Sequence, residues 1–402
     1  MAKIRISIKY LVLLILSAIF LYVQGGSLTH VIFYMLFITF LISFISIIIA
    51  RFGLNISNVT TARFYTCGEK EYIDTMVKNN TIFILPYCNI TNEGIAKIKK
   101  NYSGDAVTLS VNEHRIISEE LIYICRGKFD LGTYEVELKD LFGIFSLTYK
   151  IEGKKQIKIF PRVYDVSGMS IRGSDIIENT LSVVTSKEDP HSTKDMRKYR
   201  EGDSLKRINW KVSAKLNDLY VRNFDTVSGE EFNIFIDMNQ SNYLLDPYGK
   251  NEEMLMDFSA SLIYSFLKRS ISTRLFVNNL KEETLEIENK IDFEKFLNYL
   301  IEHKSEGTTP ITSFIQMQKL RLSSVAGMAI ITHTLSEKLL TFMMENKERG
   351  NSFVLFYLKS EINEDSVLAM SNIGIVCHKI DEEILDEEVA VSIEELIKGQ
   401  VS

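Results

Sequence analysis

The 402-residue sequence has little cysteine and little proline, and each shortage excludes a class of protein. The four cysteines, at positions 67, 88, 125 and 377, never adopt Cys-x-x-Cys spacing, which excludes a typical zinc site and a disulfide framework. Unpaired cysteines of this kind are typical of a reducing compartment. With 5 prolines and 46% hydrophobic residues, the chain is not a disordered or collagen-like polymer. Its length predicts two or three folded units.

Motifs that carry catalysis are also missing from the sequence. It contains no glycine-rich phosphate loop ending in Gly-Lys-Ser/Thr, no His-Glu-x-x-His and no Gly-x-Ser-x-Gly. None of the 6 histidines stands beside a convincing nucleophile. Asp189 and His191 form a weak pair in a polar stretch, which leaves an unrecognised hydrolase as the least favoured reading. The sequence therefore favours a protein that is not an enzyme.

Acidic residues are absent from the amino terminus, although the whole chain carries a net charge of −6. Residues 1–52 carry +4, so the remainder carries −10. An acidic body of this size does not favour bulk binding to nucleic acid. We therefore expect no specific nucleic-acid partner.

Two long uncharged runs follow the first basic residues. Tyr10–Val23 approaches the length of a membrane-spanning helix, and Val31–Ala50 reaches it. The connector between the runs has no Lys or Arg, whereas both outer flanks do, which predicts a two-pass hairpin with both termini in the cytoplasm. A cleaved signal peptide is the alternative, but the residues before Gly25 are not small and a second run follows at once. Residues 1–52 are thus expected to form a hairpin in the cell membrane, in contact with lipid through residues 6–50.

The middle of the chain, residues 53–185, has the pattern of an all-β sandwich. Short alternating runs such as Thr81–Leu85 and Ala106–Val111 are separated by turn residues at spacings typical of antiparallel strands. The segment holds no cluster of histidine, cysteine or acidic residues. A scaffold is the expected role.

In residues 229–402, apolar runs of strand length alternate with longer segments that have the periodicity of a helix. This pattern predicts a doubly wound α/β domain with a mostly parallel sheet. The predicted strands are Phe232–Ile236, Thr273–Val277, Gly327–Ile331, Ser352–Leu358 and Ile375–Lys379. The predicted helices are Met254–Lys268, Phe293–His303, Ile311–Leu320, Ser336–Lys347 and Ile393–Lys398. Ligands of such sheets bind beyond the carboxyl ends of the strands. Those ends include Asp237–Ser241, Asn278–Asn279 and Thr332–Thr334.

A dense basic segment, residues 186–228, joins the two predicted soluble domains and contains the only tryptophan. It resembles the signature of the bacterial "domain of unknown function 58" family. The matching positions are Arg197, Tyr199, Gly202, Asp203, Arg207, Ile208, Trp210, Lys211, Ser213 and Ala214. Upstream, Asp140–Phe145 is similar to a segment of the family's sandwich. Three roles remain open for the segment: a structural joint between domains, a docking face for an acidic protein, or a phosphate-binding patch.

The resemblance implies a carboxyl-terminal domain similar to von Willebrand factor A. In that fold a divalent metal such as Mg2+ is bound by three loops, and the matching positions here are Asp237, Asn239, Ser241 and Thr308. The third loop reads Thr332-His333-Thr334, with histidine where the fold has aspartate. Asparagine retains an oxygen for a hard cation, but imidazole suits softer metals. The loops are therefore expected to be degenerate.

The resemblance also implies a partner, because proteins of this family often accompany MoxR-type AAA+ ATPases. The leading hypothesis is a membrane-anchored, non-enzymatic scaffold or adaptor for such an ATPase. The alternative is a metal-dependent protein-binding domain that uses the degenerate metal-ion-dependent adhesion site.

Overall fold

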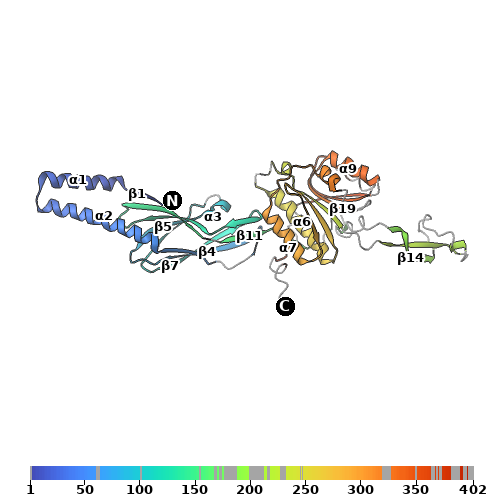
Figure 1. The fold of residues 1–402 in the computed structure, drawn as a ribbon, viewed down its shortest axis with the longest axis horizontal. Helices are drawn as coiled ribbons and strands as arrows, with labels where there is room; N and C mark the ends of the chain where they lie inside the picture. The colour runs from blue at the N-terminus through green and yellow to red at the C-terminus, as the bar shows by residue number, and fades with distance from the viewer. Residues whose placement is uncertain are drawn as a thin grey trace. The chain divides into compact units, whose positions relative to one another are not determined.

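The architecture is described from a computed structural model of the chain, shown in Figure 1. The structure describes residues 2–59, 64–99, 102–153, 155–166, 170–171, 174–175, 188–198, 212–214, 218–226, 232–244, 246, 248–318, 327–348, 351–363, 367, 370, 374–381, 390–392 and 396. The chain divides into two compact units, Met1–Phe160 and Pro161–Ser402. The predicted limit of the β-domain at residue 185 lies outside the described residues.

The first unit begins with two apolar helices, α1 (Ile8–Gln24) and α2 (Ser27–Gly53). Gly25 and Gly26 separate the helices, with φ angles of +57° and +103° that side-chain-bearing residues rarely adopt. The hydroxyl of Tyr10 donates to the carbonyl of Leu36 at 2.9 Å, so the helices run side by side. Of the helices described, α2 alone is long and apolar enough to cross a membrane.

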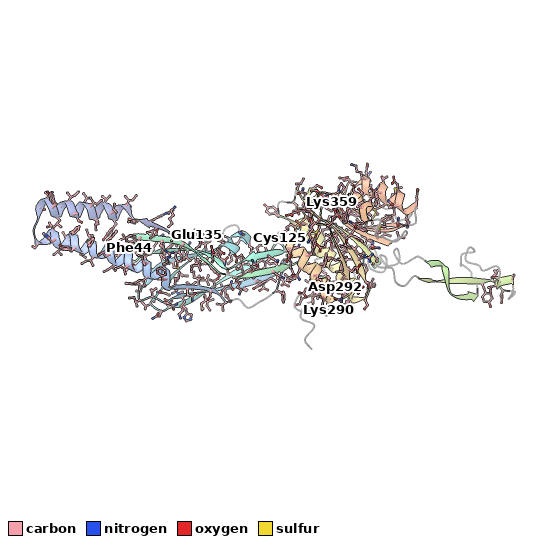
Figure 2. All side chains as sticks on the ribbon, viewed as in Figure 1. Phe44, Cys125, Glu135, Lys290, Asp292 and Lys359 are labelled. Carbon is pink, nitrogen blue, oxygen red and sulfur yellow. The ribbon has the colours of Figure 1, made fainter. Side chains whose placement is uncertain are left out.

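One side of the last turns of α2, within the predicted span Val31–Ala50, packs inward instead of facing outward. Ile47 and Ala50 are each only 2% exposed and lie in the hydrophobic core of the first unit. The rings of Phe40 and Phe44 pack against Phe145 at centroid distances of 5.1 and 5.6 Å, and Figure 2 labels Phe44. An apolar run that is long enough to span therefore divides its surface between the exterior and the core of its own unit.

Three sheets complete the first unit. Their strands are β1 (Lys3–Ile6), β2 (Leu54–Asn58), β3 (Phe64–Thr66), β4 (Lys70–Asn79), β5 (Leu85–Asn92), β6 (Asp105–Leu109), β7 (His114–Ile122), β8 (Gly127–Asp130), β9 (Thr133–Lys139), β10 (Phe145–Glu152) and β11 (Gln156–Phe160). The sheet orders are β1-β10-β9-β5-β6, β2-β4-β7 and β3-β11-β8, and a short helix, α3 (Glu93–Ile98), follows β5. Alternate residues of the first two sheets meet in one core, which includes Ile56, Val77, Cys88 and Val136. The all-β sandwich prediction is confirmed as far as this: the middle of the chain forms several β-sheets.

A six-stranded sheet forms the centre of the second unit, in the order β18-β17-β16-β19-β20-β21. Its strands are β16 (Phe232–Asp237), β17 (Thr273–Asn278), β18 (Glu283–Ile287), β19 (Gly327–Leu335), β20 (Ser352–Ser360) and β21 (Ile375–Lys379). All pairings are parallel except that of the edge strand β18. The α/β prediction is confirmed to this extent.

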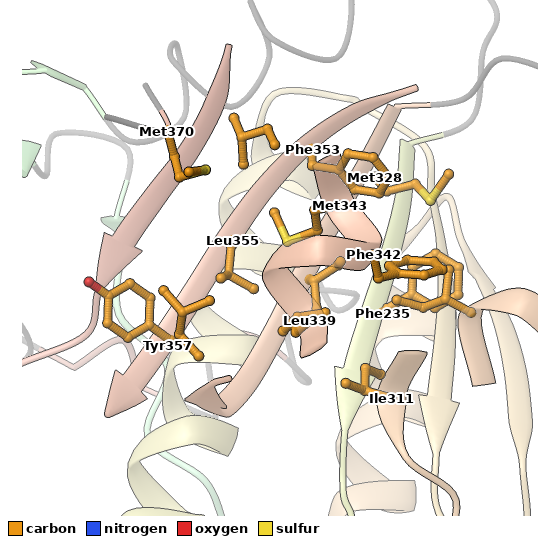
Figure 3. Packing of buried hydrophobic residues seen from close by; sticks show 14 of the residues in the cluster. Phe235, Ile311, Met328, Leu339, Phe342, Met343, Phe353, Leu355, Tyr357 and Met370 are labelled. Carbon is orange, nitrogen blue, oxygen red and sulfur yellow. The ribbon is translucent and has the colours of Figure 1, made fainter. Parts of the chain in front are cut away.

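Helices cover both faces of this sheet, as the doubly wound pattern predicts. They are α6 (Lys250–Lys268), α7 (Lys290–Glu302), α8 (Ile311–Gln318) and α9 (Glu337–Glu348). Phe235 and Leu355 share a core with α8 and α9, including Ile311 and Leu339 (Figure 3). The next residue along β20, Phe356, faces α6, where its ring lies 5.0 Å from that of Phe258. Because neighbouring strand residues point to opposite faces, this places α6 on the other face of the sheet.

The basic segment contributes a separate pair of antiparallel strands, β14 (Glu188–Lys198) and β15 (Tyr220–Thr226). A further short pair consists of β12 (Ser170–Ile171) and β13 (Ser174–Asp175). The predicted helix Ile393–Lys398 lies almost entirely outside the described residues.

Candidate functional site at the carboxyl ends of β16, β19 and β20

A cavity of about 600 Å³ opens where strands β16, β19 and β20 end. Asp237, Thr332 and Lys359 line it from the three strands, and Asp246 and Lys338 line it from the segments that precede α6 and follow β19. This is the sheet edge at which the sequence predicts ligand chemistry. Asp237 and Phe235 lie on the same face of β16, so the cavity adjoins the α8 and α9 side of the sheet.

Asp237 is the buried centre of this site, with only 3% of its surface exposed. Its Oδ1 accepts hydrogen bonds from the Asn278 side-chain amide at 3.0 Å and from the Asn239 backbone N–H at 3.3 Å. Its Oδ2 accepts from the Thr332 hydroxyl at 2.8 Å and from the Asn242 amide at 3.0 Å. Four donors therefore occupy the roughly four lone-pair sites of one carboxylate.

Burial raises the pKa of Asp237, because the low-dielectric interior disfavours the charged form. The bonds from Thr332, Asn242, Asn278 and the Asn239 backbone act in the opposite direction. These donors come from three separate segments of the chain. Asp237 therefore ties β16, β17 and β19 together at the edge where the cavity opens.

Asn239 organises the loop that follows β16. Its Oδ1 accepts hydrogen bonds from the backbone N–H of Ser241 at 2.9 Å and from the Ser241 hydroxyl at 2.7 Å. Its amide donates to the carbonyl of Thr309 at 2.9 Å. Asn239 and Ser241 thus bind each other and the neighbouring loop, while both also line the cavity.

Thr308, the residue predicted to act from the second loop, is exposed and is not among the residues that line the cavity. Its neighbour Thr309 contributes a backbone carbonyl to Asn239 and Asn278, at 2.9 and 2.8 Å. The hydroxyl that reaches Asp237 belongs to Thr332. The second loop thus lies against the loop after β16, and the group that it presents there is the Thr309 carbonyl.

Gly307 sets the position of this second loop. Its N–H donates to the Met238 carbonyl at 2.9 Å, and its own carbonyl accepts from Gln240 N–H at 2.8 Å. A Cβ at this position would lie 2.8 Å from the Asn278 carbonyl oxygen and 2.9 Å from the Met238 carbonyl oxygen. Only a residue without a side chain allows the two loops to approach this closely.

We expect Gly307→Ala to lower the free energy of unfolding of the second unit by about 1–3 kcal/mol, the usual cost of forcing extra volume into a packed site. Hydrogen exchange of peptides from β16 and β17 measures the effect locally. The matched control is Thr308→Ala, an exposed neighbour whose change should stay within about 0.5 kcal/mol. A larger loss for Thr308→Ala than for Gly307→Ala would contradict this account of the loop.

His333 occupies the third loop position with only 5% of its surface exposed. Its Nδ1 lies 2.7 Å from the Thr334 hydroxyl oxygen, and its ring packs edge-on against Tyr243 at 5.4 Å. Burial, and then the positive charge of Lys359, lower the pKa of His333. Nε2 is buried and has no hydrogen-bond partner among the described residues, and Nδ1 meets a hydroxyl, so neither ring nitrogen bonds the carboxylate that would orient a general base.

The resident side chains do not fit a divalent cation. A cation at Asp237 would need lone pairs that four N–H and O–H donors already occupy. Asp246, the other aspartate of the lining, accepts three backbone N–H groups at the start of α6. Among the residues that the structure describes, no three His, Cys, Asp or Glu side chains form a group that could hold a metal ion.

The family-signature residues are mostly outside the described part of the chain. These are Tyr199, Gly202, Asp203, Arg207, Trp210 and Lys211. Arg197 lies in β14 opposite Val221, and the structure describes only its backbone. Ser213 is buried, and its hydroxyl oxygen accepts a hydrogen bond from Tyr220 N–H at 2.9 Å. Asp189 and His191 also lie in β14, where side chains are not described.

Comparison with known proteins supports the family to which the signature points. The model of the family described as "Protein of unknown function DUF58" matches residues 195–312, a range that includes all the signature positions and the loops around Asp237 and Gly307. No curated protein matches the chain.

Several solved structures show weak similarity to parts of the chain. The CARDB domain of the PF1109 protein from Pyrococcus furiosus is 10% identical over 26% of this chain and 84% of that domain, with a TM-score of 0.17. A β-glucosidase from Listeria innocua is 9% identical over 26% of this chain and 16% of its own, with a TM-score of 0.16. The alkylpurine DNA glycosylase AlkC of Pseudomonas fluorescens is 13% identical over 27% of this chain and 30% of its own, with a TM-score of 0.17. No assignment follows from such scores.

Proposed function

We propose that this chain is a membrane-anchored, non-enzymatic adaptor whose second unit binds a protein partner at the cavity beside Asp237. The observation that carries the proposal is the saturated Asp237 carboxylate beneath an open polar cavity. A carboxylate that is fully hydrogen-bonded within the protein suits the binding of a partner protein. A catalytic carboxylate, in contrast, needs a free lone pair for a proton or a metal. The second unit, in this proposal, is a von Willebrand factor A-like domain that works without the metal of that fold.

Lysines supply the positive charge with which the cavity would meet its partner. Lys338 at the start of α9 and Lys359 near the end of β20 are both exposed and line the cavity. Their ammonium groups suit an acidic side chain or a terminal carboxylate on a partner protein. The family resemblance makes a cytoplasmic MoxR-type AAA+ ATPase the proposed partner.

Helices α1 and α2 form the proposed membrane anchor, a two-pass hairpin. The rest of the chain lies in the cytoplasm in this proposal. The length and composition of α2 support the anchor, and the basic residues on the outer flanks support the orientation. A metal-dependent binding domain, the alternative reading, has less support because the donors around Asp237 leave no room for the ion.

The test is capture of the purified MoxR-type ATPase from the same organism by the full-length chain in detergent. We expect the wild type to capture the ATPase equally with magnesium and with EDTA, whereas Lys338→Glu combined with Lys359→Glu should reduce capture at least tenfold, or about 1.4 kcal/mol. Lys290→Glu, an exposed reversal at the start of α7 that Figure 2 labels, is the matched control.

Each other outcome decides against part of the proposal. No capture by the wild type overturns the ATPase as partner. Equal capture by the double lysine variant moves the docking face away from the cavity. Loss of capture when EDTA replaces magnesium favours the metal-dependent alternative.

A further inference from the structure

The turn between β9 and β10 presents two large apolar side chains to the outside of the first unit. Leu141 is 65% exposed and Phe142 is 57% exposed. They belong to the Asp140–Phe145 segment that the family resemblance singles out, and the candidate site in the second unit does not use them. Two adjacent exposed residues of this size leave apolar surface in water and make the turn a candidate contact surface.

The turn holds these side chains outward by specific hydrogen bonds. Asp140 is only 6% exposed, and its carboxylate accepts from the backbone N–H of Phe142 at 2.9 Å and of Phe145 at 2.6 Å. The Gly143 N–H closes the turn by donating to the Asp140 carbonyl at 3.1 Å. Ile144, the next residue, is buried at 1% exposure. The segment thus buries Asp140 and Ile144 and holds Leu141 and Phe142 on the outside.

This turn lies at the point where the apolar helices leave the sheet. Ile6 of β1 pairs with Phe145, and Ser7 N–H donates to the Ile144 carbonyl at 2.8 Å immediately before α1 begins. The rings of Phe40 and Phe44 on α2 also pack against Phe145. The turn therefore lies beside the start of α1 and beside the part of α2 that contains Phe40 and Phe44.

The length of α1 gives an independent reason for a membrane contact at this level. Its 17 residues extend about 25 Å at 1.5 Å per residue. The hydrocarbon core of a bilayer is about 30 Å thick. A shortfall of about 5 Å is similar to the depth at which apolar groups insert at the interface.

Basic side chains gather at the same level. Lys3 and Arg5 are exposed on β1, which pairs with the start of β10, and Lys9 is exposed in the first turn of α1. Ammonium and guanidinium groups beside an apolar turn suit lipid phosphates above the acyl chains.

We propose that the β9–β10 turn is a third membrane contact, in which Leu141 and Phe142 insert into the bilayer interface beside α1 and so hold the first unit against the membrane surface. The inference rests on the proposed membrane anchoring and adds a site outside the helices. In this proposal the Asp140–Phe145 segment holds Leu141 and Phe142 at the depth of the bilayer interface.

The experiment places a nitroxide spin label at one cysteine at a time in the full-length chain, reconstituted in vesicles of phosphatidylethanolamine and phosphatidylglycerol. The background carries Cys125→Ser and Cys377→Ser, because these two cysteines are partly accessible whereas Cys67 and Cys88 are buried. Phe142→Cys and Leu141→Cys report on the turn. Met35→Cys, 70% exposed on α2, is the lipid reference, and Ile124→Cys, 62% exposed just past the end of β7, is the water reference.

Collision with oxygen relative to a water-soluble nickel chelate measures membrane depth. We expect this ratio to be several-fold higher at Leu141 and Phe142 than at Ile124, and to approach the ratio at Met35. If the label at Met35 gives a lipid-like ratio while the labels at Leu141 and Phe142 give the same ratio as Ile124, the third contact is overturned and the anchor stands. If the label at Met35 itself gives a water-like ratio, both the anchor and the third contact are overturned.

Discussion

Asp237→Ala should lower the free energy of unfolding of the second unit by roughly 3–5 kcal/mol, because several buried donors lose their acceptor together. The Thr332 hydroxyl and the Asn278 amide are directed at this carboxylate from β19 and from the end of β17. Thr332 and Asn278 are 1% and 0% exposed, so water does not replace the lost partner without opening the site.

Hydrogen exchange of β16, β17 and β19 peptides, together with urea unfolding of the full-length chain in detergent, measures this loss. The matched control is Glu361→Ala, an exposed carboxylate on the lining of the same cavity that should change stability by less than about 0.5 kcal/mol. If magnesium stabilises the wild type but not Asp237→Ala, the carboxylate holds a cation after all.

The second large effect is a dependence of stability on pH that comes from Asp257 of α6. This carboxylate is 0% exposed; its Oδ1 accepts from the backbone N–H of Arg162 at 2.9 Å and its Oδ2 accepts from Arg162 Nε at 2.8 Å. One and two helical turns further on, the hydroxyl oxygens of Ser261 and Ser265 accept from the N–H groups of Tyr164 and Val166. Asp257 is thus the first of three side chains on one face of α6 that bind an extended segment of the chain.

Burial raises the pKa of Asp257 to about 6, although the charge of Arg162 acts against the rise and Glu253 adds to it. Between the unfolded value of about 4 and this folded value, the native state binds more protons than the unfolded state. Stability should therefore fall as the pH rises from about 4 to about 6, by about 3 kcal/mol from this group. Above about pH 6 the contribution is level.

Asp257→Asn should remove that slope, because an amide does not titrate. Urea midpoints of the full-length chain between pH 4 and pH 7 measure the difference between the variant and the wild type. Asp292→Asn is the control: bonding to Lys295 lowers the pKa of Asp292, so its titration lies below this range and its variant should keep the wild-type slope. An unchanged slope in Asp257→Asn would show that other groups carry the pH dependence.

Periodicity identified the central strands of the second unit because each is buried on both faces. Val354, Leu355 and Phe356 are consecutive and each 0% exposed, so the apolar run in β20 is continuous and easily recognised. Strand β18 was missed because it is an edge strand, Glu283–Ile287, whose polar residues alternate with Leu285 and Ile287. Helix α6 begins four residues before its predicted start, where Asp246 accepts from the first backbone N–H groups.

Other features depend on residues that only the fold brings together. Local periodicity and strand polarity are enough to predict the apolar helices, the β-rich middle, the α/β third and the position of Asp237 at a strand end. Only the folded chain shows that Thr332, 95 residues from Asp237, supplies the hydroxyl at that carboxylate, and that Thr308 does not. It also shows that Ile47 and Ala50 pack against the core of the first unit, although their apolar run has the length of a membrane span. Local sequence specifies what a segment prefers to bury, whereas the three-dimensional packing of distant segments decides which partner covers it.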